Sequence, residues 1–234
     1  MKFELCLQVL CGVFWSIAYI LIIHKSFKDK TYGIPLFALS LNLAWEFTFS
    51  FIYPPGDLLF AKIIFLTWLL LDLIILYTFF KYGYKSRKYI GIISKKSLYI
   101  FTMFILVCSI LFMILSVNDF SILFNNDITQ TSGFIANIQN LIMSILFVSM
   151  LLNRGNTSGQ SIYIAIFKWM GTLTVAILKF TNMLPSITTE LFIIALIQFF
   201  DILYIYLIYK FSKRKNTISW GKTIYKLLWN LKNL

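Results

Sequence analysis

The chain has 234 residues, of which 59% are hydrophobic and only 13% charged, and its mean hydropathy is +0.82. A soluble domain of this size could not bury so many apolar side chains, so the composition excludes one and predicts a polytopic membrane protein. The net charge of +12 would suit a nucleic-acid partner, but the charge is confined to a few segments, which argues against that partner.

Seven apolar segments predict an all-α fold with seven transmembrane helices. Each segment is close to the ~20 residues that a helix needs to cross a bilayer, and none shows the alternation of a barrel strand. We interpret the first as a retained helix, because no small-residue cleavage site follows it. The segments are 4–23, 33–53, 60–80, 98–117, 133–152, 160–180 and 188–209.

The basic residues predict how these helices are oriented. Of the 21 Lys and Arg residues, 17 lie at 25–30, in a basic loop at 81–96, at Arg154 and from Lys210 to the end, whereas loops 118–132 and 181–187 carry none. The positive-inside rule therefore places the N-terminus outside and the C-terminus in the cytoplasm. We divide the chain into a transmembrane domain, 1–211, and a basic amphipathic tail, 212–234, on the cytoplasmic membrane surface.

Three carboxylates fall near the middle of predicted spans. Glu46 lies in the second segment, Asp72 in the third and Asp201 in the seventh, all within roughly 5 Å of the midplane at 1.5 Å per residue. An acid at that depth costs ~2.5 kcal/mol or more on insertion scales, so these residues are the catalytic candidates. Glu190 shares a helix face with Asp201 but lies about 16 Å higher, where we expect an interface residue or a partner of the helix dipole.

The neighbours of these acids are aromatic or amide side chains. A buried carboxyl group is favoured in its neutral form and can then donate a proton, and ring faces stabilise cations. This combination suits protonation of a prenyl alkene or epoxide followed by carbocation cyclisation. Interhelical hydrogen bonding by the acids and ordinary packing by the rings remain open as alternatives. The substrate-binding candidates are Asn42, Trp45, Trp68, Gln198 and Tyr204. Asn42 and Gln198 each lie one turn before an acid, and we expect them to hold its carboxyl group or to join helices.

The motifs that are missing restrict the chemistry further. The sequence has no DDxxD or DxDD motif, no GxSxG, and neither a P-loop nor a Rossmann glycine pattern. Its only histidine is His24, and its three cysteines form no CxxC pair. We therefore predict no metal site and no cofactor.

Four short motifs, taken in order, resemble those of the integral-membrane terpene cyclases best known from fungal meroterpenoid and indole-diterpene pathways. The resemblance covers roughly residues 10–210 and includes the seven-helix count. The four motifs are Asn42-Leu-Ala-Trp45-Glu46-Phe47, Trp68-Leu-Leu-Leu-Asp72, Arg154-Gly-Asn-Thr-Ser-Gly159-Gln160-Ser161 with Lys168-Trp-Met-Gly171-Thr172, and Asp201 with Tyr204.

The resemblance implies that Glu46 and Asp201 are the essential acids, that Asp72 supports them, and that no metal is required. It also implies a lipophilic prenyl or terpenoid substrate and a product with fused rings. The composition, rich in Lys, Asn and Ile, suggests an AT-rich genome, so we predict a bacterial member located in the cytoplasmic membrane. The Arg154–Gln160 loop, with Lys168 and Lys179, could hold a polar head group or simply form a turn with snorkelling lysines.

Two functional classes fit these observations. The first is a membrane-embedded terpene cyclase, in which Glu46 is the leading proton donor and Asp201 its partner or the terminal base. The second is a proton- or cation-coupled transporter of a small solute or lipid that uses the same acids. A transporter predicts helices broken at midspan, whereas the four prolines lie near helix ends. We therefore predict a metal-independent cyclase.

Overall fold

All regular structure in the described part of the chain is helical. The computed structural model describes residues 2–56, 59–85 and 94–232, with side chains over the same ranges except for residues 2 and 214–232. The predicted all-α fold is thus confirmed. The elements are α1 Lys2–Asp29, α2 Leu36–Phe47, the π-helical turn η1 Thr48–Ile52, α3 Leu59–Tyr82, α4 Lys95–Ser121, η2 Ile122–Phe124, α5 Ile128–Arg154, α6 Ile162–Phe180 and α7 Thr188–Lys232.

Local sequence sets several helix ends. The hydroxyls of Ser94 and Ser161 cap the N-termini of α4 and α6, and the Asp127 carboxylate accepts from two backbone N–H groups of α5. Bonds from the Gln130 side chain and backbone also hold the pKa of Asp127 below its usual range. Gly155 ends α5 with φ +63°, a conformation in which a side chain would be strained.

Within the described residues, six helices are long and apolar enough to cross a membrane, namely α1, α3, α4, α5, α6 and the first part of α7. The second predicted span, 33–53, is shorter than expected: its apolar helix runs over Leu36–Ile52. At 1.5 Å per residue it reaches about 25 Å, less than the ~30 Å of a hydrocarbon core. Most of its residues are buried, so this helix contacts other helices more than lipid.

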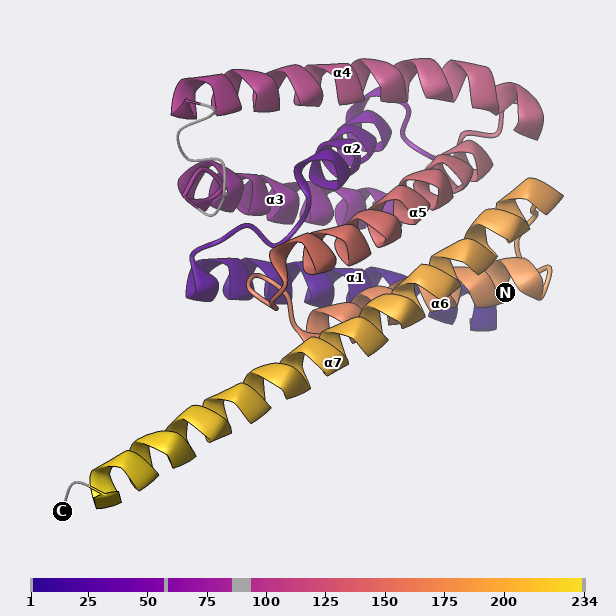
Figure 1. Ribbon diagram of the computed structural model, residues 1–234. Coiled ribbons are helices and arrows are strands. Elements are labelled where there is room, and N and C mark those ends of the chain that lie inside the picture. The colour runs from indigo at the N-terminus through magenta and orange to yellow at the C-terminus, as the bar shows by residue number, and fades with distance from the viewer. Residues whose placement is uncertain (1, 57–58, 86–93, 233–234) are drawn as a thin grey trace.

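The arrangement of the helices explains that burial. Helix α2 packs against α3, α4 and α5, while α1 packs against α6 and α3. Helix α7 lies across α5 and α6, and its C-terminal part extends beyond the other helices (Figure 1). The outward surfaces of α3 and α4 are apolar and exposed, as a lipid-facing surface requires.

Helix α7 has one buried face, formed by residues spaced alternately four and three apart. This spacing keeps a single stripe of a helix against its neighbours. Its members are Glu190, Ile194, Ile197, Asp201, Tyr204 and Ile208. Glu190 and Asp201 therefore share the interior face, and the interpretation of Glu190 as an interface residue is confirmed.

The helix α7 continues without a break through residue 211, where we placed a domain boundary. We predicted an amphipathic tail at residues 212–234. Nearly all of its side chains lie outside the described residues, so this stays a prediction. The same holds for Arg87 and Lys88 of the predicted basic loop. The orientation of the termini also stays a prediction.

Candidate active site

Glu46 lies where four helices meet. Its Oε1 accepts a hydrogen bond from the hydroxyl of Tyr19 on α1, at 3.2 Å. That hydroxyl accepts from Asn42 Nδ2 at 2.7 Å, and Asn42 Oδ1 accepts from Gln139 on α5 at 3.3 Å. All four side chains are buried. Asn42 was predicted to hold the carboxyl of Glu46, but it acts through Tyr19 instead.

Asp72 comes from α3 and completes this cluster. It lies beside Asn42 and Glu46 and is fully buried. Neither of its oxygens has a partner at hydrogen-bonding geometry, and the same is true of Glu46 Oε2 and Gln139 Oε1. Burying polar atoms without partners is costly. Four such oxygens in one place make this cluster the strongest candidate for a functional site in the described part of the chain.

A π-helical turn begins two residues after Glu46. It covers Thr48–Ile52, and the hydroxyls of Thr48 and Ser50 are buried without partners. Single π-helical turns within α-helices are frequent at functional sites. The turn that follows Glu46 is therefore consistent with a functional site at this residue.

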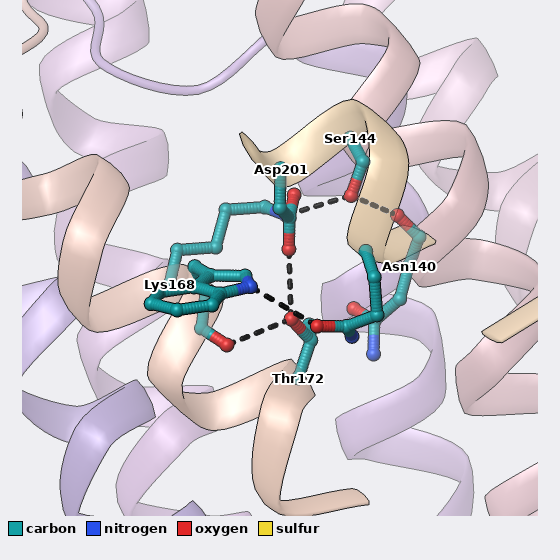
Figure 2. Close-up of polar contacts among 7 residues, drawn as sticks. Asn140, Ser144, Lys168, Thr172 and Asp201 are labelled. Atoms are coloured by element: carbon teal, nitrogen blue, oxygen red, sulfur yellow. Dashed lines mark hydrogen bonds and ion pairs between the residues drawn. The ribbon is translucent and has the colours of Figure 1, made fainter. Parts of the chain in front are cut away.

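Asp201 belongs to a second cluster, which joins α5, α6 and α7 (Figure 2). Its Oδ1 is 2.5 Å from Lys168 Nζ, and its Oδ2 accepts from the hydroxyl of Thr172 at 2.7 Å. Lys168 and Thr172 are one turn apart on α6 and so present both groups to the same carboxylate. Lys168 also donates to Ser144 Oγ at 2.7 Å. Asp201 thus has a cation as its partner, whereas Glu46 has none among the residues whose side chains the structure describes.

Trp15 on α1 stands between the two clusters. Its ring is 5.9 Å from that of Tyr19, and Lys168 Nζ lies 5.8 Å from the Trp15 ring. From Tyr19 onward, the rings of Trp68, Phe65 and Trp45 follow one another at centroid distances of 6.5, 5.9 and 4.6 Å. Aromatic faces therefore run past the Glu46 cluster and reach Lys168.

Gly171 allows Trp15 to approach α6 this closely. A Cβ at Gly171 would lie 2.7 Å from Cδ1 and Nε1 of Trp15. We expect Gly171→Ala to destabilise the protein by about 1–3 kcal/mol, because the buried indole must move. Thermal unfolding in detergent measures the change. Gly133→Ala on α5, where a Cβ meets nothing within 4 Å, is the matched control, and an equal loss in both variants would contradict this packing argument.

The remaining predicted site residues occupy other places. Gln198 on α7 accepts from the indole N–H of Trp169 on α6 at 3.0 Å, which is the interhelical contact of its two expected roles. Tyr204 is buried and donates to Gln160 at 2.8 Å. The indole N–H of Trp45 donates to the carbonyl of Ser132, and that of Trp68 donates to Ser16.

The two lysines considered for a polar head group are both engaged in ion pairs. Lys168 pairs with Asp201, and Lys179 is 2.9 Å from Glu190 Oε1, with all four side chains almost fully buried. Neither is a snorkelling lysine. Arg154 contacts the connection between α1 and α2: its guanidinium donates to the carbonyl of Tyr32 and stacks 4.2 Å from that ring.

Sequence reasoning did not single out Tyr19, Gln139, Trp15 or Ser144. These are ordinary residues on apolar helices, and only the packing of helices brings them to the acids. Lys168 did carry a signal, because a lysine inside a span needs a partner. Among the described residues, no group of three or more His, Cys, Asp or Glu side chains could hold a metal ion; the prediction that no cofactor is needed stays a prediction.

The fold and the two clusters define a helical integral membrane protein with carboxyl groups buried among aromatic rings. A family model, the Pyr4-like transmembrane terpene cyclases, matches residues 2–214. The chain belongs to this family. The class of enzyme predicted from the residues, a terpene cyclase, is therefore confirmed at the level of the family.

Individual relatives agree with this assignment. The chain is 29% identical to the asnovolin H synthase of Aspergillus novofumigatus over 174 residues, which cover 74% of this chain and 68% of that protein. It is 32% identical to a Pyr4-family terpene cyclase of Annulohypoxylon moriforme, over 70% of this chain and 65% of the relative. A terpene cyclase of Penicillium terrestre is 28% identical over 70% and 62%.

The chain thus spans about two thirds of the length of these curated relatives. All three come from fungi, so the predicted bacterial source gains no support from them. No solved structure matches the chain.

Proposed function

We propose that this chain is a membrane-embedded terpene cyclase that starts its reaction by proton transfer. The observation that carries the proposal is the cluster of unpartnered carboxyl oxygens at Glu46 and Asp72, buried beside a run of aromatic rings. Two adjacent carboxyl groups without a cation cannot both stay ionised at low dielectric. At least one then carries a proton that it can donate.

In this reaction Glu46 protonates a terminal alkene or epoxide of a linear prenyl chain. Tyr19 fixes the carboxyl through Oε1, which leaves Oε2 free to face the substrate. Asp72 positions and polarises Glu46 from α3. The faces of Trp68 and Tyr19 stabilise the developing carbocation, each by several tenths to ~2 kcal/mol when dry. Carbon–carbon bonds then form in sequence and produce fused rings.

The substrate and the membrane setting follow from the same observations. A long apolar prenyl chain can enter from lipid, and the lack of Asp-rich magnesium motifs in the sequence supports initiation by a proton instead of a metal. We place the N-terminus outside and the C-terminus in the cytoplasm, with residues 212–234 on the anionic membrane surface. From the composition rich in Lys, Asn and Ile, we further propose that the membrane is a bacterial cytoplasmic membrane.

A mass-spectrometric assay on purified protein in detergent tests this function. Farnesyl and geranylgeranyl compounds are supplied as alcohols, diphosphates, terminal epoxides and quinone conjugates, with a chelator present. We expect a product of the same mass as its substrate and with more rings, formed at the same rate with or without divalent metal. Folded, monodisperse protein that converts none of these compounds would contradict the proposal.

A further inference from the structure

The ion pair between Lys168 and Asp201 lies at the centre of the helix bundle, away from water. The side chains are both about 2% exposed, and the pair ties α6 to α7 while Ser144 adds a contact from α5. Such a pair is costly to desolvate, and apolar residues often stabilise a core as well or better. Within the described residues, and unlike the second buried pair between these helices, Lys179 and Glu190, this one also lies against aromatic rings.

The contacts indicate which atoms carry the protons. The hydroxyl of Ser144 donates to the carbonyl of Asn140 at 2.8 Å, so Lys168 must be the donor in its contact with Ser144. Lys168 Nζ also lies 5.8 and 5.9 Å from the ring centroids of Trp15 and Phe147, as suits a cation. An ammonium ion fits these contacts, with one N–H for Asp201, one for Ser144 and its charge near two rings.

The Asp201 carboxyl receives hydrogen bonds on both oxygens. Lys168 donates to Oδ1, and the hydroxyl of Thr172 donates to Oδ2 at 2.7 Å, a shorter contact than its 3.0 Å approach to the Trp169 carbonyl. A carboxylate accepts such bonds and keeps lone pairs to spare, whereas a carboxylic acid would bring a proton of its own. Asp201 thus has the surroundings of an anion.

We propose that Lys168 is a positioning residue that keeps Asp201 ionised, so that Asp201 is the base that ends the cyclisation. This inference rests on the proposed cyclase function. Glu46 gives its proton to the substrate at the start. At the end, a C–H bond next to the cation breaks, its electron pair forms the product alkene, and the proton passes to Asp201. No net proton is consumed, because the proton gained by Asp201 balances the one lost by Glu46, and its return to Glu46 restores both groups.

The same two helices supply a matched control. Lys179 and Glu190 form a second buried ion pair between α6 and α7. Lys168 and Lys179 are 11 residues apart, as are Glu190 and Asp201, so the pairs lie three turns, or about 16 Å, from each other. The Lys179–Glu190 pair has the same chemistry, and its further hydrogen-bond partners are Asn137 and the Pro185 carbonyl instead of Thr172 and Ser144.

Infrared difference spectroscopy tests the charge of Asp201 without any substrate. We expect wild type minus Asp201→Asn to show the antisymmetric carboxylate stretch. Lys168→Met minus Lys168→Met/Asp201→Asn should instead show the carbonyl stretch of a neutral carboxylic acid. A neutral-acid band for Asp201 in wild-type protein would overturn the proposal whether or not the protein cyclises anything, which separates this inference from the proposed function.

Product analysis tests the role of the base. We expect Asp201→Asn and the charge-neutral Lys168→Met/Asp201→Asn variant to form roughly 10²-fold less of the wild-type product. Both should still consume substrate and release alcohols from water capture or alkenes of different position. The double variant removes both charges of the pair. It can therefore fold even if a single replacement, which leaves one buried charge unpaired, prevents folding. Lys179→Met/Glu190→Gln should give the wild-type product mixture.

Two results would overturn the assignment. One is a wild-type product mixture at the wild-type rate from folded Lys168→Met/Asp201→Asn, which would make the pair structural only. The other is a folded Asp201→Asn variant that consumes no substrate at all, which would make Asp201 necessary for the first proton transfer.

Discussion

Glu46→Gln is expected to reduce turnover by at least about 10²- to 10⁴-fold, the usual contribution of a general acid. The amide has the shape of the carboxyl group and can still accept from the Tyr19 hydroxyl, now at 3.2 Å. It cannot release a proton to an alkene or an epoxide. The loss should therefore appear in substrate consumption as a whole, measured by mass spectrometry, and no new products should replace the lost one.

The folded state of this variant serves as its control. Glu46→Gln removes a group that has no cationic partner, so its thermal unfolding in detergent should stay close to that of the wild type. Glu4→Gln, near the start of α1 and far along the chain from the site, provides a matched carboxylate-to-amide change. Wild-type product from Glu46→Gln would remove this residue from the mechanism.

Lys179→Met is expected to lower the free energy of unfolding by roughly 3–5 kcal/mol, because it leaves a buried acid without its partner. Glu190 is fully buried and contacts Lys179 and Asn137 Nδ2, the latter at 2.8 Å. Lys179 also donates to the carbonyl of Pro185 in the connection between α6 and α7. Losing the ammonium thus removes two kinds of contact at one end of the bundle.

A double-mutant cycle separates the pair from the individual residues. Lys179→Met/Glu190→Gln carries no unpaired charge and should recover most of the lost stability in thermal or denaturant unfolding. If the double variant were as unstable as the sum of both single changes, the two residues would not be coupled, and the stabilising role of this ion pair would be refuted.

The sequence predicted the architecture because lipid imposes simple demands on composition. Long apolar runs had to be helices, and the helix count followed from them. The length of the second span was overestimated: the apolar run at 33–53 includes Pro35, after which α2 begins, and residues past Ile52, where the π-helical turn ends. An inner helix can be short because its neighbours, not lipid, cover its ends.

The sequence indicated the acids of the candidate site but not their partners, and this difference has a physical cause. Glu46, Asp72 and Asp201 stood out because acids are rare inside apolar spans. Their partners depend on how the helices are rotated and in which register they pack, and neither is readable from one helix alone. Asn42 and Gln198 were both placed one turn before an acid, yet each binds a side chain from a neighbouring helix instead. The roles assigned to the acids stay predictions.

The two ion pairs between α6 and α7 bear on how the chain enters the bilayer. α6 has the lowest mean hydropathy of the six long helices, 1.5, and carries both lysines. Alone in lipid, it would expose two ammonium groups, and α7 would expose two carboxylates. Paired, the two lysines and the two acids neutralise one another inside the hairpin. We therefore expect α6 to remain beside the insertion machinery until α7 has been synthesised, so that the last two spans partition into the membrane as one unit.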